Sequence, residues 1–127
     1  MVTNYTEYSF VSLQQHLTKL FPSSELLVDS GKAYTNKMID DRANDLAYLL
    51  AAQGVRKGTH VGIYGNNSAN WIICFFAIQK LGAFCVLLNP ALTPEEIAKH
   101  SDAADITHLC FGDSVHTVNE ESFVNAL

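Results

Sequence analysis

The chain has 127 residues, about the length of one small domain, and 48% of them are hydrophobic while 17% are charged. This composition excludes an intrinsically disordered protein, because disordered chains are poor in apolar residues and rich in charge. The net charge of −5 and the lack of a basic stripe argue against binding to nucleic acid or to a membrane surface. Cys74, Cys85 and Cys110 lie in apolar runs and no signal-peptide pattern opens the sequence, so we expect free buried thiols and a cytoplasmic protein.

A long apolar stretch in the middle of the chain raises the question of a membrane span. Lys80 is the only charged residue between Gly58 and Pro94, and residues 71–88 are almost wholly apolar. The break at Gln79–Gly82 divides this run into two pieces that are each too short to cross a bilayer. We therefore expect a buried helix followed by a buried strand, and no membrane span. So little charge also indicates a surface that other protein covers, so the isolated chain is expected to self-associate through an exposed apolar face.

Apolar periodicity and turn residues predict the helices and strands in chain order. Helices are expected over residues 8–21, from a Thr35 cap to Gly54, over 69–81 behind Ser68, and from a Thr93 cap to about residue 100. Strands are expected at 26–28 and 33–34, joined as a hairpin by Asp29–Lys32, and at 60–64, 83–88 and 106–111. Ser114 is expected to cap a last helix that reaches Leu127. The unbroken apolar segment 83–88 predicts a strand covered on both faces.

This alternation of strands and helices predicts an α/β fold. We expect a small parallel sheet of about three strands with flanking helices, plus a short N-terminal β-hairpin. No internal repeat or low-complexity linker divides the sequence. Residues 1–127 should therefore form a single subdomain with a leading helix (1–25), a core (26–111) and a C-terminal helical tail (112–127).

The turn Gly62–Ser68 lies between an expected strand and an expected helix, where nucleotide-binding folds hold phosphate. Its glycines have the spacing G-x-x-G rather than G-x-G-x-x-G, so a polar helix cap is the simpler interpretation. Gly31–Lys32 lacks two positions of the P-loop pattern, where Leu26 and Ala33 stand. A small flavodoxin-like domain that binds a phosphorylated ligand at residues 65–68 stays open as an alternative.

Other residues that could carry chemistry also have a simpler structural interpretation. His108 and Cys110 share one face of a strand, with His100 and His116 nearby in sequence, but no CxxC or HxxxH pattern supports a metal site. No G-x-S-x-G pattern marks a nucleophile, and Ser68 is better explained as a helix cap.

Acidic pairs and aromatic residues are likewise expected to be structural. The acidic pairs lie near expected helix starts, where the helix dipole favours negative charge; they are Asp40/Asp41, Glu95/Glu96 and Glu120/Glu121. The aromatic residues expected in the core are Trp71, Phe75, Phe76 and Phe84. The residues alone thus predict no catalytic, cofactor-binding or metal site.

Several stretches occur in a recognisable order and spacing. They are Asp29–Thr35, Arg42–Ala47, Gly54–Gly58, Asn67–Trp71, Lys80–Ala83, Leu88–Ile97 and Ser101–Ala103. Together they resemble the N-terminal end of the adenylate-forming, AMP-binding enzyme superfamily, which includes acyl-CoA synthetases, luciferases and the adenylation domains of peptide synthetases. The similarity covers roughly residues 26–111. Within it, the sequence of residues 89–97 resembles acyl-CoA synthetases more than peptide-synthetase domains.

The resemblance implies that the chain is an N-terminal fragment of an ATP-dependent, AMP-forming acid–thiol ligase of the acyl-CoA synthetase type, a group with roles in fatty acid metabolism. Such enzymes activate a carboxylate with ATP to an acyl-adenylate, release pyrophosphate, and pass the acyl group to a thiol such as CoA. ATP, Mg and CoA are therefore implied for a complete enzyme and none is expected on this chain. The family's phosphate loop, adenine-binding and ribose-binding segments and catalytic lysine have no counterpart in the sequence. The resemblance consequently assigns no catalytic residue and implies that the chain is inactive alone.

The sequence departs from the family pattern at two helix starts. Three residues after Thr35, Met38 replaces the glutamate that is usual in the family, so no capping box can form there. Asn70, directly before Trp71, stands where many relatives carry an acid. The expected partners are the remainder of the ligase, in the same or a separate chain, and a small-molecule carboxylate. The alternative is a non-catalytic truncated paralogue, or a subunit completed by a partner chain.

Overall fold

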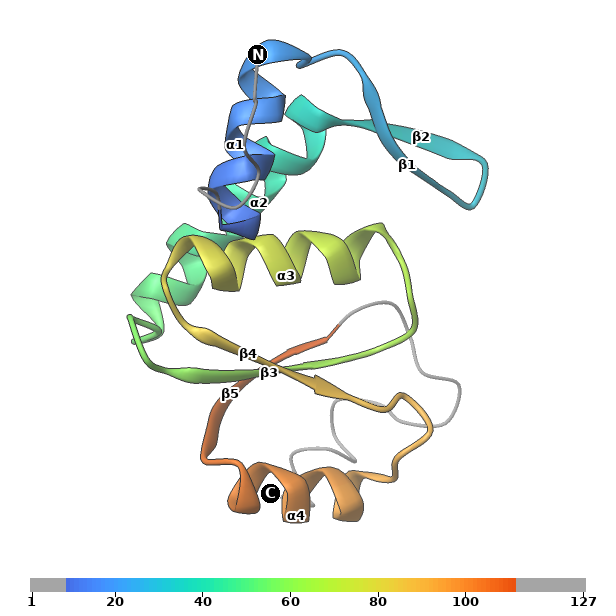
Figure 1. Cartoon of the computed structure of the whole chain (residues 1–127). Helices are drawn as coiled ribbons and strands as arrows, with labels where there is room; N and C mark the ends of the chain where they lie inside the picture. The colour runs from blue at the N-terminus through green and yellow to red at the C-terminus, as the bar shows by residue number, and fades with distance from the viewer. Residues whose placement is uncertain (1–8, 112–127) are drawn as a thin grey trace.

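The protein is described by a computed structural model over residues 9–111, and its elements alternate as expected for an α/β fold (Figure 1). The helices are α1 (Phe10–Leu20), α2 (Asn36–Ala52), α3 (Ala69–Lys80) and α4 (Pro94–Ala103). The strands are β1 (Glu25–Asp29), β2 (Lys32–Thr35), β3 (His60–Tyr64), β4 (Phe84–Leu88) and β5 (Ile106–Phe111). The expected tail over 112–127, with its helix behind Ser114, lies outside the described residues.

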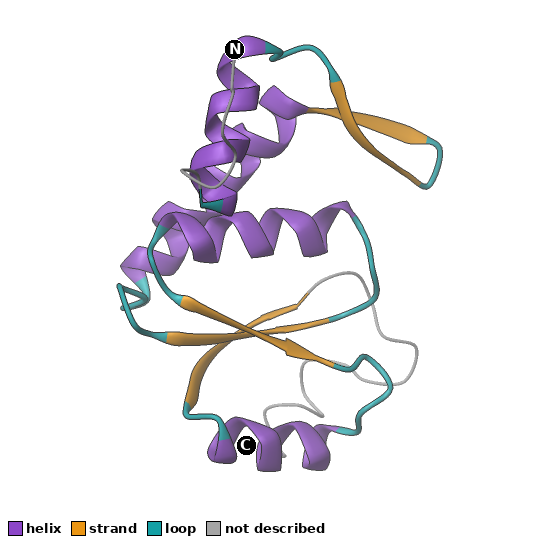
Figure 2. Ribbon diagram, in the orientation of Figure 1, coloured by secondary structure: helices purple, strands orange, loops and turns teal. Residues whose placement is uncertain are grey.

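The main sheet has three parallel strands in the order β4-β3-β5, so β3 is central. Helices α1, α2 and α3 lie on one side of this sheet and α4 on the other, as Figures 1 and 2 show. Each strand connects to the next through a helix, which is the connection that parallel strands require. The predicted fold class, a small parallel sheet with flanking helices and a separate hairpin, is confirmed.

The hairpin β1–β2 is antiparallel and projects away from the main sheet (Figure 1). Asp29 pairs with Lys32, so Ser30 and Gly31 form a two-residue turn. Both turn residues have positive φ, 52° and 78°. Two positive φ values in succession are what a tight hairpin turn needs, because they match the right-handed twist of the flanking strands.

Side-chain caps fix where the helices begin. Thr93 accepts a hydrogen bond from the backbone of Glu96, whose side chain in turn accepts from the Thr93 N–H, so the expected signal forms a complete capping box. Ser68 caps α3 in the same way without the reciprocal bond. Thr35 accepts from the Met38 N–H only, as expected from the missing glutamate. Helix α4 ends at Ala103, about one turn beyond its predicted end.

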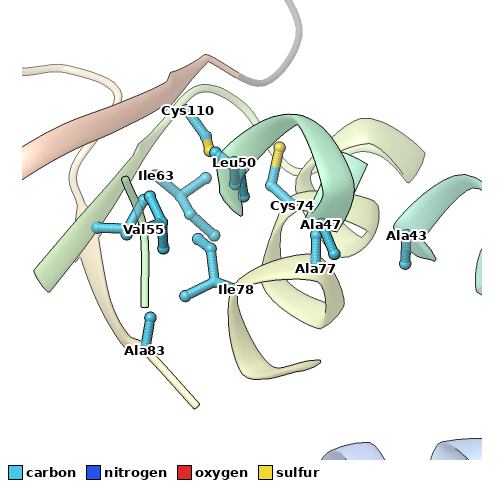
Figure 3. Packing of buried hydrophobic residues seen from close by; sticks show 11 residues of the cluster. Ala43, Ala47, Leu50, Val55, Ile63, Cys74, Ala77, Ile78, Ala83 and Cys110 are labelled. Carbon is cyan, nitrogen blue, oxygen red and sulfur yellow. The ribbon is translucent and has the colours of Figure 1, made fainter. Parts of the chain in front are cut away.

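The larger hydrophobic core lies between the sheet and the α2–α3 layer (Figure 3). Its buried members come from α2, α3, the strands β3 and β5, and the segments before β3 and β4; they are Ala43, Ala47, Leu50, Val55, Val61, Ile63, Cys74, Ala77, Ile78, Ala83 and Cys110. Small residues on both helices let α2 and α3 approach closely. Trp71, Phe75 and Phe76 are half-buried against this core, which confirms their expected packing in part.

A second, smaller core joins α4 to the opposite face of the sheet. Tyr64, Leu88 and Ile97 are buried there. Gly62 lies in the central strand, where a Cβ atom would come within 2.8 Å of a methyl group of Leu109 and 3.0 Å of one of Leu88. The absence of a side chain at residue 62 therefore lets these two leucines close over β3.

The expectation that both faces of residues 83–88 are covered is wrong for the chain described. The side chains of Phe84 and Leu87 are each 60% exposed, and Phe84 is therefore not a core residue as expected. The physical reason is that β4 is an edge strand, so among residues 9–111 no further strand lies beside it with side chains that could cover Phe84 and Leu87. In that same range, none of the helices is both long and apolar enough to cross a membrane.

Candidate functional site at the carboxyl edge of the sheet

The carboxyl end of β3 is the position at which open α/β sheets usually bind ligands. The connections that leave β3 and β4 lead to α3 and α4 on opposite sides of the sheet, and such a reversal opens a crevice between neighbouring strand ends. The turn that leaves β3 contains Gly65 and Ser68 and runs directly into α3. The Ser68 hydroxyl accepts a hydrogen bond of 3.1 Å from the Trp71 N–H, so the predicted role of Ser68 as a cap is confirmed.

The first N–H group of α3 is already bound to a carboxylate of the chain itself. Asp29, the last residue of β1, accepts a 2.9 Å hydrogen bond from the Ala69 N–H through its Oδ2 atom. A negative charge is favourable here because the N-terminal end of a helix carries partial positive charge. Asp29 thus fills a position that a phosphate would take in a nucleotide-binding turn, and it also fastens the hairpin to α3. Sequence analysis missed this role, since forty residues separate the two partners.

Tyr64, the last residue of β3, packs with Leu88 and Ile97 on the side of the sheet that α4 covers. Its side chain is buried, and its hydroxyl donates to the carbonyl oxygens of Leu92 at 2.7 Å and Pro90 at 3.3 Å. Burial, with a smaller contribution from the Glu96 carboxylate, raises the pKa of Tyr64, so the phenol stays protonated and remains a donor at neutral pH. Tyr64 therefore holds the connection between β4 and α4 against the end of the central strand.

We expect Tyr64→Phe to lower the free energy of unfolding by about 1.5 kcal/mol, because two carbonyl groups lose their shared donor while the ring keeps its packing. Equilibrium urea denaturation measures this change. Tyr48→Phe is the matched control, since the Tyr48 side chain is 79% exposed on α2 and its loss of a hydroxyl should have no effect. Equal effects of the two substitutions would contradict the role assigned to Tyr64.

The three cysteines are free thiols. Cys74 and Cys110 are buried and Cys85 is half-buried. A hydrogen bond with Cys110, together with burial, raises the pKa of Cys74, and burial raises the pKa of Cys85 to about 11. Because thiolates are the reactive form of cysteine, Cys74 and Cys85 are unreactive at neutral pH.

His108, one of the histidines considered as metal ligands, is hydrogen-bonded within the chain itself. His108 bonds the Gln53 carbonyl oxygen through Nε2 at 2.8 Å and Thr107 through Nδ1 at 2.7 Å. Cys110 points into the core, and His100 is exposed on α4. His116 lies outside the described residues. Within residues 9–111, no three potential metal ligands lie close enough together to hold an ion.

The acidic pairs have different roles from one another. Glu95 and Glu96 lie in the first turn of α4, as expected. The expectation for Asp40 and Asp41 is wrong, because α2 begins at Asn36 and its first turn contains no acidic residue. Instead, Asp40 forms an ion pair of 2.7 Å with Lys80 of α3. Asp41 pairs with Lys37 one turn earlier, also at 2.7 Å, and Glu120/Glu121 lie outside the described residues.

Two open hollows flank α1. The larger, of about 470 Å³, lies between α1, α2 and α3 and is lined partly by Gln15, Asn44, Tyr48 and Lys80. The smaller, of about 400 Å³, lies along α1 and includes Asp40 in its wall. The ammonium of Lys80 and the carboxylate of Asp40 neutralise each other, so neither hollow offers that charge to a ligand.

Comparison with known proteins identifies the class of this fold. A family model described as AMP-binding enzyme matches residues 14–126. The o-succinylbenzoate CoA synthetase of Bacillus subtilis, in complex with a product analogue, superimposes with a TM-score of 0.79 at 22% identity, over 90% of this chain and 23% of that protein. The N-terminal subdomain of NpsA from Klebsiella oxytoca, in complex with 3-hydroxybenzoyl-AMSN, gives a TM-score of 0.75 at 22% identity, over 81% of this chain and 26% of that one.

The protein belongs to the AMP-binding enzyme family. The 2-succinylbenzoate–CoA ligase of Listeria monocytogenes is 34% identical over 101 residues, which are 80% of this chain and 22% of the ligase. The 3-oxocholest-4-en-26-oate–CoA ligase of Rhodococcus rhodochrous is 30% identical over 80% of this chain and 18% of its own length. The chain therefore spans about a fifth of the length of the curated relatives that it matches. The predicted resemblance is confirmed.

Proposed function

We propose that this chain forms the N-terminal part of an AMP-forming acid–thiol ligase of the acyl-CoA synthetase type and has no ligase activity by itself. The observation that carries the proposal is the match of residues 14–126 to the AMP-binding enzyme family. In the complete enzyme a carboxylate would react with ATP to give an acyl-adenylate and pyrophosphate, and CoA would then displace AMP. The relatives are named as CoA ligases of 2-succinylbenzoate, of 3-oxocholest-4-en-26-oate and of medium- or long-chain fatty acids, which supports a carboxylate substrate without favouring any one of these acids.

The described residues act as a scaffold in this proposal. Ser68 and Asp29 occupy N–H groups at the start of α3, and Tyr64 bonds the chain's own carbonyl groups. These residues do not fit a phosphate cradle, although the related synthetase of Bacillus subtilis has been crystallised with ATP and magnesium. ATP, Mg and CoA would accordingly bind mainly to the part of the ligase that this chain does not contain. The free thiols further support a reducing compartment such as the cytoplasm.

The test is an assay of the purified 127-residue chain with ATP, Mg, CoA and o-succinylbenzoate. We expect no pyrophosphate release above background, with the Listeria ligase as positive control. Calorimetric titration with ATP, AMP and FMN should give no saturable heat, whereas a flavodoxin-like domain would bind FMN. Pyrophosphate release from the chain alone would contradict the proposal.

The rest of the ligase could belong to the same gene product or to a separate chain. A truncated, non-catalytic paralogue is the remaining alternative, and it shares the fold described here. The nucleotide sequence downstream of Leu127 distinguishes these arrangements. A neighbouring reading frame that begins near the phosphate loop would favour a subunit completed by a partner chain.

A further inference from the structure

The outer edge of β4 is the most exposed apolar part of the main sheet. We define the β4 edge as the backbone of Phe84–Leu88 on the side away from β3, together with the side chains of Phe84 and Leu87. Both side chains are 60% exposed. Strand β4 pairs with β3 alone among the described strands, so its outward N–H and C=O groups have no strand partner within residues 9–111.

The β4 edge lacks the features that normally protect an edge strand from pairing. Natural edges carry charged side chains, proline or a bulge. Residues 84–88 contain no charge and no proline, and the register between β3 and β4 is regular. The β5 edge differs, because its pairing with β3 contains a register shift and the strand carries the polar residues Thr107 and His108. Of the two edges, that of β4 is the better template for an added strand.

The order of the strands indicates what kind of segment would add there. In a doubly wound sheet of this order, the strand that follows β5 in the chain joins next to β5, not next to β4. A strand at β4 must therefore come from a distant segment or from another chain. Lys80, the only charge between Gly58 and Pro94, turns inward to Asp40, so this stretch of chain itself presents no charge to an arriving segment. The matched relatives extend over roughly five times the length of the match, which leaves ample chain to supply such a segment.

We propose that the β4 edge is where the remainder of the ligase joins this chain, by adding an apolar strand beside β4. The proposal rests on the proposed function and specifies which surface of the chain the rest of the enzyme covers. Exposed apolar side chains also occur outside the sheet, on α1, on the hairpin and on α2, where Tyr48 and Leu49 follow charged Asp45. Tyr48 therefore provides a matched control position.

The experiment is co-expression of the tagged 127-residue chain with the Listeria 2-succinylbenzoate–CoA ligase from which the matched N-terminal segment has been deleted. We expect the truncated ligase to co-purify with the chain. Leu87→Lys should reduce its recovery at least tenfold, whereas Tyr48→Lys should leave recovery unchanged. Circular dichroism melts of both variants alone establish that they fold. Hydrogen exchange provides a second measurement, in which the amides of β4 should exchange more slowly in the complex than in the free chain.

Three results would overturn the proposal. These are equal recovery with the two lysine variants, no recovery with the unmodified chain, and a homodimer through β4 that persists in the presence of the truncated ligase. The last result would identify a second copy of the chain as the occupant. A complex that forms through β4 but releases no pyrophosphate with ATP, CoA and o-succinylbenzoate would instead contradict the proposed function while leaving the assignment of the β4 edge intact.

Discussion

Lys80→Met should lower the free energy of unfolding by about 3 kcal/mol, because it leaves the Asp40 carboxylate without its cation at the interface between α2 and α3. The side chains of Lys80 and Asp40 are only 7% and 19% exposed, and their charged atoms are 2.7 Å apart. Methionine has nearly the same length and apolar stem as lysine, so packing is largely kept. The loss would therefore arise from the charge that remains buried. Urea denaturation measures the change.

The chain contains a matched control for this substitution. Lys37 and Asp41 form an ion pair of the same length on the surface of α2, with side chains 65% and 57% exposed. Lys37→Met should leave the free energy of unfolding unchanged within error, because exposed pairs are screened by water and salt. A double variant, Asp40→Leu with Lys80→Met, should recover most of the lost stability, since it removes both charges. If Lys80→Met and Lys37→Met have equal effects, the buried pair does not stabilise the helix layer.

Helix caps and central strands could be predicted because their signals are local. Thr93, Pro94 and Glu96 are neighbours in sequence, and they form the capping box that their order predicts. The bounds of β3 and β5 agree with the expected strands at 60–64 and 106–111. In both strands a short apolar run coincides with burial on at least one face, so the apolar pattern alone is sufficient to predict where each strand begins and ends.

Contacts between distant residues could not be predicted in this way. Asp29 with Ala69 and Asp40 with Lys80 are each separated by forty residues, and no local pattern marks either pair. The sequence around Asp40 is compatible with a helix start, so its local pattern predicts an interaction with the helix dipole. Only the packing of α2 against α3 shows that it meets a cation from the other helix.

The exposure of β4 shows a different limit of sequence interpretation. An unbroken apolar strand is typical of the interior of a parallel sheet, yet Phe84 and Leu87 are largely exposed here. If this chain is one part of a ligase, as proposed, its apolar composition reports the environment in the complete enzyme. The disagreement between pattern and exposure is therefore informative, and it supports an additional strand beside β4.

Ile97→Ala should lower the free energy of unfolding by about 3 kcal/mol and release α4 from the sheet. Ile97 is fully buried and is the only buried apolar residue of α4, where it packs with Tyr64 and Leu88. A helix of ten residues is marginal in water without tertiary contacts, even with a complete capping box. The truncated side chain would thus weaken the attachment of the whole helix and not only leave a cavity.

Graded variants separate these two effects. Ile97→Val removes one methylene group and should cost about 1 kcal/mol, with α4 still attached. Ile72→Ala, at a half-buried position of α3, serves as a control for the loss of an isoleucine outside the small core. Hydrogen exchange should show faster exchange of the α4 amides in Ile97→Ala than in either other variant, while the amides of α2 and α3 keep their protection. If amide exchange in Ile97→Ala were instead faster by the same factor in all elements, α4 and the larger core would unfold as one unit. The smaller core would then not unfold separately, and the prediction that α4 alone is released would be wrong.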